Sequence, residues 1–363
     1  MGVRFRSVAH VEMNSMAGFW QGKSVLVTGH TGFKGSWLSL WLSGLGAKVS
    51  GIALEPETDP SLFEQLHLAD RLNHSIGDIR SYETVRRKVI EVQPDVLFHL
   101  AAQPLVLASY EDPLTNWDTN VMGTAHVLQA LRELEKPCAA VMITTDKVYE
   151  NREWIYPYRE EDRLGGHDPY SASKAACELL ISSWRNSFFA DHNVRVATAR
   201  AGNVIGGGDW AANRILPDLA RALSVGKRLT VRNPKSSRPW QHVLEPLSGY
   251  MLLAEALYEG GKISESYNFG PETGDVRPVR DLVSTALNSW PGNWEDASQP
   301  GAPHEAGQLS LGIERARNEL GYAPRWDFER SVRETMQWYK TAAEGGDVLP
   351  VTLAQIRDFE MSG

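Results

Sequence analysis

Runs of apolar residues alternate with helical patterns along the first two hundred residues of the chain. Most of the apolar runs are continuous, which is typical of strands buried on both faces of a parallel sheet. They predict strands over residues 25–27, 48–54, 74–80, 94–103, 139–149 and 194–200. Between them, apolar residues recur every three or four positions and predict helices over residues 37–45, 82–92, 115–135 and 169–184. This alternation predicts an α/β fold built on a doubly wound parallel sheet.

A glycine-rich turn joins the first predicted strand to the first predicted helix. Gly29, Gly32 and Gly35 follow one another at G-x-x-G-x-x-G spacing. Glycine leaves no Cβ between the backbone and a ligand, and the amino end of a helix attracts phosphate. An ordinary strand-to-helix loop is the alternative, but a strand before the glycines and a helix after them favour dinucleotide binding. The turn therefore predicts a Rossmann-like fold.

Acidic residues follow the second and third predicted strands. Glu55 lies about 20 residues beyond Gly35, the usual distance of a carboxylate that binds the cofactor ribose. It is equally well explained as a solvated loop residue. No arginine follows closely to receive a 2′-phosphate, which favours NAD over NADP. Asp78 either accepts a hydrogen bond from the adenine amine or caps the helix over residues 82–92.

Small residues end the fourth predicted strand. Ala101 and Ala102 would let a cofactor approach the backbone, whereas His99 lies within the apolar run and is predicted to be packed in the core. Asn120 lies within the predicted helix over residues 115–135 and is either satisfied in the core or bridges water in the active site.

Two further groups of residues carry candidate chemistry. Thr145, Asp146 and Lys147 follow the fifth strand, and parallel sheets bind ligands beyond the carboxyl ends of their strands. A strand-end ion pair is the alternative. Tyr170 and Lys174 share one face of the next helix, where an ammonium near the phenol favours its use as a base.

The rhythm of the chain changes after residue 200. Residues 203–209 are predicted to form a loop, and arginines and lysines are frequent over the next stretch, where one or two would suit a diphosphate. A helix over residues 242–258 is predicted to return to the first domain. We therefore expect residues 19–200 with 241–260 to form a dinucleotide-binding domain, and residues 201–240 with 261–350 to form a smaller C-terminal substrate-binding domain.

Composition narrows the functional classes. The chain has 363 residues, a formal net charge of −8 and two cysteines. We expect no nucleic-acid partner, because no basic stretch is present, and no metal site, because the cysteines have no metal-ligand spacing. No apolar run is long enough for a membrane span, and a reducing cytoplasm is predicted. Residues 1–18 are expected to be a disordered leader without signal-peptide character.

Several motifs together resemble one family. They are Thr28-Gly-His-Thr-Gly-Phe-Lys-Gly35, His99-Leu-Ala-Ala102, Thr145-Asp-Lys147, Tyr170-Ser-Ala-Ser-Lys174 and Arg238-Pro-Trp-Gln-His-Val243. They are similar to the extended short-chain dehydrogenase/reductases, and within these to the CDP-glucose branch of the nucleotide-sugar 4,6-dehydratases. The resemblance runs from about Phe19 to Pro350.

The resemblance implies a redox-neutral dehydration of CDP-glucose with bound NAD, for deoxysugar biosynthesis such as that of O-antigen lipopolysaccharide. Tyr170, its pKa lowered by Lys174, would take the proton of the sugar 4-OH, and Thr145 would bind the 4-oxygen. Asp146 would protonate the leaving 6-OH. Lys147 stands where the dTDP-glucose enzymes have glutamate, and it would be the base at C5 or would stabilise the enolate.

The resemblance also implies a set of binding residues. The cofactor would be held by Gly29, Thr31, Gly32, Phe33, Lys34, Gly35, Glu55, Asp78, Ile79, Ala101, Ala102, Gln103, Asn120, Tyr170 and Lys174. The substrate would be held by Asn203, Arg214, Arg238 and His304, of which Arg238 would meet the diphosphate. One departure is that the usual ribose-binding aspartate aligns with Ala53.

Relatives of this kind pair through two helices, here residues 115–135 and 170–185, so a homodimer or possibly a homotetramer is expected. The alternative activities are dehydration of a dTDP- or GDP-sugar and 4-epimerisation of a nucleotide sugar. Asp146 and Lys147 argue against the epimerase, which needs no acid at C6. A non-catalytic NAD-sensing protein is a third alternative, against which the presence of both Tyr170 and Lys174 argues.

Overall fold

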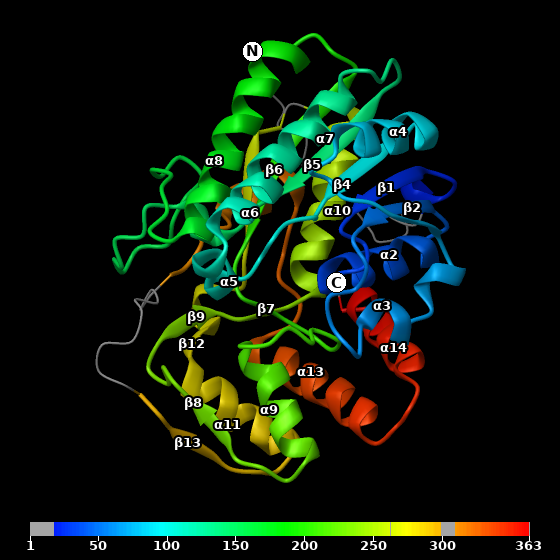
Figure 1. Ribbon diagram of the computed structural model, residues 1–363. Helices are drawn as coiled ribbons and strands as arrows, with labels where there is room; N and C mark the ends of the chain where they lie inside the picture. The colour runs from blue at the N-terminus through cyan, green and yellow to red at the C-terminus, as the bar shows by residue number, and fades with distance from the viewer. Residues whose placement is uncertain (1–17, 262, 299–308, 363) are drawn as a thin grey trace, which may run out of the picture.

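A seven-stranded parallel sheet forms the centre of the molecule (Figure 1). The computed structural model describes residues 18–261, 263–298 and 309–362, so most of the predicted leader lies outside the described residues. The strand order is β11-β6-β5-β4-β1-β2-β3, and every neighbouring pair is parallel. The bounds are β1 (Ser24–Thr28), β2 (Lys48–Ala53), β3 (Asn73–Ile76), β4 (Val96–His99), β5 (Cys138–Ile143), β6 (Val194–Ala201) and β11 (Ser266–Phe269). The predicted Rossmann-like doubly wound sheet is confirmed.

Helices cover both faces of this sheet. Alternate residues of β1 show why: Leu26 packs with α4 (Tyr82–Val92), α7 (Gly123–Leu131) and α8 (Pro169–Trp184). Val25 and Val27 pack on the opposite face, against α2 (Phe33–Gly44) and α10 (Leu244–Glu259). Because both faces are buried, the strands carry no polar alternation.

The seventh strand corrects the predicted division of the chain. Residues 266–269 fall within the predicted smaller domain, but in the structure they form β11, which pairs with β6 at the edge of the main sheet. Tyr267 and Phe269 are fully buried there. A four-residue strand is too short to show a reliable period, so only its long-range partner identifies it.

Two local predictions are also corrected. The helix expected over residues 115–135 consists of α6 (Pro113–Trp117), a π-helical turn (Asp118–Met122) and α7, and its helical part ends at Leu131. Asp78 does not cap α4. The Ser81 side chain accepts a hydrogen bond from the Thr84 N–H, because Ser81 directly precedes the helix whereas Asp78 lies in the preceding turn.

A smaller unit packs beyond the carboxyl edge of the sheet, in the lower half of Figure 1. Its apolar cluster joins Leu216, Leu282 and Val332, among others, from three helices. The elements of the rest of the chain are α3 (Leu62–Gln65), α5 (Val106–Glu111), β7 (Val204–Ile205), α9 (Ile215–Ser224), β8 (Leu229–Val231), β9 (Ser237–Pro239), β10 (Gln241–His242), β12 (Val276–Pro278), α11 (Val279–Ser289), β13 (Trp294–Asp296), α12 (Glu314–Leu320), α13 (Phe328–Ala343) and α14 (Val348–Glu360). The short β7 lies within the stretch predicted to be a loop.

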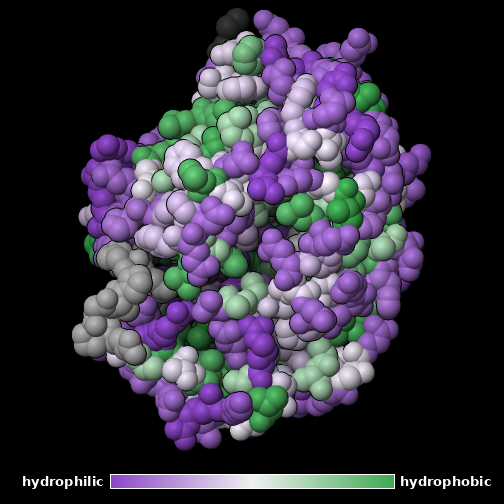
Figure 2. Space-filling model, viewed as in Figure 1, coloured by the Kyte–Doolittle hydropathy of each residue, from purple (hydrophilic) through white to green (hydrophobic). Residues whose placement is uncertain are grey.

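The last helix returns to the sheet layers. The indole N–H of Trp41 on α2 donates to Glu360 on α14 at 2.8 Å, and Trp41 packs edge-on against Phe359. Hydrophilic side chains cover most of the face shown in Figure 2, with apolar ones scattered among them. None of the helices in the described residues is long and apolar enough to cross a membrane.

Candidate active site

A cavity of about 1470 Å³ lies at the carboxyl edge of the sheet. Its walls come from the segments that follow β1, β2, β3, β4, β5 and β6, and from residues of the smaller unit that include Arg214, Arg232 and Arg238. Ligands of open α/β sheets bind at this edge. All the predicted catalytic residues line the cavity: Thr145, Asp146, Lys147, Tyr170 and Lys174.

The glycine turn forms one end of the cavity. Gly29 has a φ of +78°, and a Cβ there would come within 2.7 Å of the Ala101 nitrogen. A Cβ on Gly35 would collide with the carbonyl of Gly29. Gly32 begins α2 without a side-chain cap, which leaves the first N–H groups of the helix to a ligand. The turn therefore fits the phosphates of a dinucleotide.

The predicted adenosine contacts lie on the same wall. Glu55 is exposed just beyond β2 and lines the cavity. The Thr31 hydroxyl donates to the carbonyl of Leu54 at 2.9 Å and so ties the glycine turn to the end of β2. Asp78 accepts from Arg80 at 2.6 and 2.9 Å, and these hydrogen bonds lower the pKa of its carboxyl.

The remaining predicted cofactor residues, Phe33, Ile79, Ala102 and Gln103, also line the cavity, but Asn120 does not. Asn120 is buried behind Gln103: its Oδ1 accepts from the Gln103 N–H at 2.8 Å, and its Nδ2 donates to Ser173 at 2.9 Å. We correct Asn120 from a cofactor contact to a residue that supports the cavity wall. His99 is packed in the core as predicted, 2.8 Å from the Thr28 hydroxyl.

Lys34, a predicted cofactor residue, brings a cation into the cavity wall. Its Nζ lies 3.4 Å from the Tyr250 hydroxyl, on α10. Burial is the largest cause that lowers the pKa of Lys34, to about 8, and the cations of Arg214 and Lys174 add to it against the opposing pull of Asp146. The amine therefore stays mostly protonated at pH 7 and loses its proton as the pH rises through about 8.

A tight turn after β5 presents the acid–base candidates. The Thr145 hydroxyl donates to Asp146 Oδ1 at 3.0 Å, and the Lys147 Nζ lies 3.9 Å from the same oxygen. Asp146 is almost wholly buried, yet its Oδ2 has no hydrogen-bond partner among the described residues. That oxygen lies opposite Gly202, where a Cβ would come within 2.7 Å of it. Asp146 is thus a buried carboxyl with free bonding capacity.

Tyr170 and Lys174 face the cavity from the first two turns of α8. Asp168 caps this helix by accepting from the Ser171 N–H at 2.9 Å. Burial raises the pKa of Tyr170 to about 12, which the Thr145 hydroxyl opposes and Asp146 reinforces. The Lys174 ammonium donates to the carbonyl of Ile143 at 2.9 Å, and burial lowers its own pKa.

The predicted lowering of the Tyr170 pKa by Lys174 is therefore not found in the protein alone. The reason is that burial disfavours the charged phenolate and raises the pKa of Tyr170, while the Lys174 ammonium is bonded to the Ile143 carbonyl.

The substrate side of the cavity has a feature that the sequence analysis missed. Arg214 Nε lies 3.3 Å from the carboxylate of Asp209, which is buried and whose pKa burial raises. The signal was an acidic residue directly after three glycines, ahead of a cation-rich stretch. Of the predicted substrate residues, Asn203, Arg214 and Arg238 line the cavity, whereas His304 lies outside the described residues; of the Asp209–Arg214 pair, only Asp209 was missed.

Comparisons with known proteins agree with this geometry. The family model for GDP-mannose 4,6 dehydratase matches residues 26–335. The chain is 48% identical over 351 residues to CDP-glucose 4,6-dehydratase of Salmonella typhimurium, covering 94% of this chain and 97% of that protein.

Two solved structures are also similar. The dTDP-glucose 4,6-dehydratase of Streptomyces venezuelae, solved with NAD, is 25% identical with a TM-score of 0.75, covering 90% of this chain and 99% of that one. An epimerase of Methanothermobacter thermautotrophicus, 22% identical with a TM-score of 0.78 over 93% of this chain and 97% of that one, shares the fold.

The matched span includes the glycine turn, the Thr-Asp-Lys turn and the Tyr-x-x-x-Lys helix, so the predicted resemblance to the nucleotide-sugar 4,6-dehydratases is confirmed. The chain belongs to the GDP-mannose 4,6 dehydratase family.

Proposed function

We propose that this protein dehydrates CDP-glucose to CDP-4-keto-6-deoxyglucose with bound NAD. The observation that carries the proposal is the meeting, in one cavity, of Tyr170 with Lys174 and of the buried carboxyl of Asp146. The first pair suits removal of a proton at C4, and the carboxyl suits protonation of a leaving hydroxyl. The 48% identity to a CDP-glucose 4,6-dehydratase supports the choice of substrate.

The glycine turn, Glu55 and the wall at Ala101 would hold the cofactor. Bound NAD would supply an acceptor for the hydride that leaves C4, the return of that hydride to C6, and a positively charged nicotinamide ring. Oxidation at C4 and reduction at C6 cancel, so the net change in the sugar is loss of one water.

Tyr170 takes the proton of the 4-OH. The protein alone holds the pKa of its phenol at about 12, so the phenolate needs added positive charge, which Lys174 and the ring of a bound cofactor would supply together. Thr145 donates its one hydroxyl proton to Asp146 in the protein alone and would turn it to the 4-oxygen when substrate binds; its contact with Tyr170 opposes the rise in the pKa of the phenol.

Asp146 delivers a proton to the 6-OH as it leaves. Its unpartnered Oδ2 faces the space that Gly202 leaves open, so the carboxyl has an atom free for this transfer. Lys147 is only about one-third exposed and faces a carboxylate, and an ammonium there suits stabilisation of the enolate that forms when the C5 proton is lost. The C5 proton needs an acceptor, which an ammonium cannot be, so the two roles combine if Lys147 takes that proton as a neutral amine and then stabilises the enolate as the ammonium it has become.

Two arginines from the smaller unit suit the diphosphate of the substrate. Arg214 is oriented by Asp209, and Arg238 lines the same wall. A guanidinium group can donate two parallel hydrogen bonds to the oxygens of one phosphate group. Asn203, two residues beyond β6, lines the same cavity and would contact the sugar.

The test is to incubate the purified protein with NAD and, separately, with CDP-, dTDP- and GDP-sugars, and to weigh the products by mass spectrometry. Loss of one water from CDP-glucose alone is expected. A product of unchanged mass would instead indicate epimerisation, and loss of water from a different nucleotide sugar would overturn the choice of substrate.

Lys147→Ala separates the two roles of the lysine. The variant is expected to reduce NAD when CDP-glucose is bound, because C4 oxidation does not need Lys147, yet to release little dehydrated product. Lys147→Arg keeps a cation that cannot act as a base, so it should recover part of the product formation if the role is electrostatic. Full turnover by Lys147→Ala would remove the residue from the mechanism.

We also propose that the chain forms a homodimer through α6, the adjoining π-helical turn and α8. Leu114, Trp117, Met122 and Leu179 on these elements are between 41% and 82% exposed, which is costly for large apolar side chains on a free surface. Sedimentation should give a dimer, and Leu179→Lys should weaken it.

The two cysteines, Cys138 and Cys177, are buried and form no disulfide, which fits a cytoplasmic location.

A further inference from the structure

A buried glutamate lies directly behind the candidate active site. Glu178 is on α8, one helical turn after Lys174, and is 4% exposed. Its Oε1 accepts from the Thr144 hydroxyl at 2.5 Å and from Arg200 Nε at 2.9 Å. Its Oε2 accepts from the Thr198 hydroxyl at 2.9 Å and from Arg200 Nη2 at 2.8 Å. The carboxylate is therefore saturated by donors from β6 and from the end of β5.

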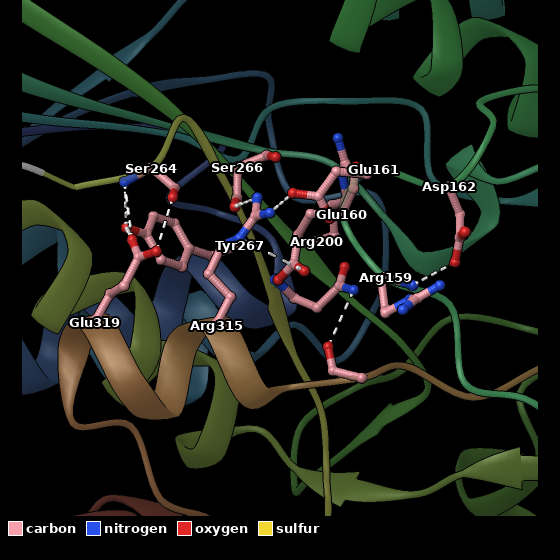
Figure 3. Close-up of polar contacts among 12 residues, drawn as sticks. Arg159, Glu160, Glu161, Asp162, Arg200, Ser264, Ser266, Tyr267, Arg315 and Glu319 are labelled. Carbon is pink, nitrogen blue, oxygen red and sulfur yellow. Dashed lines mark hydrogen bonds and ion pairs between the residues drawn. The ribbon is translucent and has the colours of Figure 1, made fainter.

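The other side of Arg200 reaches the segment that follows the catalytic turn. Its Nη1 donates to the Tyr149 hydroxyl at 2.8 Å and to the carbonyl of Glu160 at 3.0 Å. Figure 3 shows Arg200 and Glu160 next to Arg315, which donates to the carbonyl of Ser266 at 3.2 Å. The guanidinium thus links α8 to the segment between Tyr149 and α8. That segment lies beside Arg315, which contacts the edge strand of the sheet at Ser266.

Thr144 connects this network to the chemistry. It directly precedes Thr145, and its own N–H donates to the carbonyl of Ala199 at 2.9 Å. Thr145 contacts the Tyr170 phenol, which is carried by α8. The same helix carries Glu178, two turns beyond Tyr170. The hydrogen bond from Thr144 to Glu178 therefore joins the one from Lys174 to the Ile143 carbonyl in tying the strand end that carries Thr145 to the helix that carries Tyr170.

We propose that Glu178, held by Arg200, is a positioning residue that sets the place of Thr145 relative to Tyr170 through the Thr144 hydroxyl. The inference rests on the proposed function, because it assigns Glu178 to the proton transfer at C4. Stability alone does not account for the pair, since buried ion pairs are often replaced by apolar residues without loss of stability. A small displacement of reacting groups, by contrast, costs much of the rate.

The chain offers a matched pair of variants. Thr144→Val and Thr198→Val each remove one hydroxyl donor from the same carboxylate and keep the shape of the side chain. Only Thr144 adjoins a catalytic residue. We expect similar losses of melting temperature in both variants, a fall in kcat of about 10- to 100-fold in Thr144→Val, and little change in its KM for CDP-glucose. Thr198→Val should keep kcat within about twofold, because its strand end carries no reacting group.

A conservative series separates positioning from packing. Thr144→Ser keeps the hydroxyl and should retain most of kcat, whereas Thr144→Cys, with a weak S–H donor, should fall between serine and valine. This series also serves if Thr144→Val fails to fold. Equal kcat in the two valine variants, or a serine variant as slow as the valine variant, would overturn the positioning role.

The outcomes distinguish this inference from the proposed function. If the unaltered protein removes no water from CDP-glucose, the proposed function is wrong and the inference falls with it. If the unaltered protein turns over CDP-glucose but kcat of Thr144→Val stays at its level, only the positioning role is wrong.

Discussion

Two buried carboxyl groups lie on either side of the same strand end and are treated in opposite ways. Glu178, behind β5, is surrounded by donors. Burial raises its pKa, but Arg200 and the threonine hydroxyls outweigh that effect and hold the pKa below its usual range. Asp146, on the cavity side, has one oxygen near Thr145 and Lys147 and the other without a hydrogen-bond partner among the described residues.

The difference teaches where this protein keeps its reactive groups. A buried charge whose bonds are all made has no capacity left for a ligand, and it holds the surrounding elements in place. A buried carboxyl with a free oxygen costs stability, and that cost is typical of functional sites. The cavity wall holds further ionisable groups, Lys34 and Asp209, whose pKa values burial shifts towards the neutral form, whereas Glu178 behind the wall has all its hydrogen bonds made.

The largest expected effect is at the cavity. Tyr170→Phe removes the phenolic oxygen that is proposed to take the C4 proton and should lower kcat by about 10³- to 10⁴-fold. The melting temperature should change by no more than about 2 °C. Tyr156→Phe, at an exposed tyrosine away from the cavity, is the control and should leave both quantities unchanged. Substantial turnover by Tyr170→Phe would assign the base to a different residue.

Changes to the buried Glu178–Arg200 pair should lower the stability of the protein. Arg200→Met leaves Glu178 buried without its countercharge and should cost about 3–5 kcal/mol of unfolding free energy, measured by urea denaturation. Arg195→Met, at an exposed arginine on the same strand, should cost about 1 kcal/mol or less. The double change Arg200→Met with Glu178→Leu should recover part of the loss, because no unpaired charge remains. A loss in Arg200→Met as small as in Arg195→Met would break the comparison.

Asp146→Asn should lower kcat by about 10²-fold, about 2.7 kcal/mol of activation free energy, because the amide cannot donate the proton that the 6-OH needs. Its unfolding free energy should change little, because Oδ2 has no hydrogen-bond partner among the described residues that the change could remove. Glu178→Gln makes the same chemical change in the carboxylate that pairs with Arg200, and this variant should instead lose stability. If both variants lose stability equally, Asp146 is a structural residue.

The smallest effect concerns a third buried carboxyl, Glu245 on α10. Its Oε1 accepts from the N–H groups of Arg325 and Trp326, but burial prevails and raises its pKa from 4.5 to about 7. The folded state therefore binds more protons than the unfolded state between these values, so this group's contribution to stability is present at low pH and is lost as pH rises towards and through 7.

We expect Glu245→Gln to remove about 2 kcal/mol of the decline in unfolding free energy between pH 5 and pH 7.5, because the amide oxygen keeps both backbone contacts. Thermal or urea unfolding across that range measures it. Glu344→Gln, at an exposed glutamate, should leave the pH dependence unchanged. The same decline in Glu245→Gln as in the unaltered protein would contradict the assignment.

Local periodicity accounts for what the sequence determined by itself. The six apolar runs became six strands of the sheet, and the G-x-x-G-x-x-G turn and the Tyr170–Lys174 helix lie where their spacing placed them. These features depend on neighbours within a few positions, where chain geometry dictates which side chains share a face. The identity of the cavity wall followed from the same rule, since parallel strands end at one edge.

Only the tertiary structure decided which charges meet and how deeply they are buried. Glu178 and Arg200 are 22 residues apart, and β11 begins 65 residues after the end of β6, its neighbour in the sheet. The pKa of Tyr170 was predicted in the wrong direction, because spacing shows that a lysine is near but not that both groups are desolvated. Burial and long-range pairing depend on how the layers pack, and no local pattern carries that information.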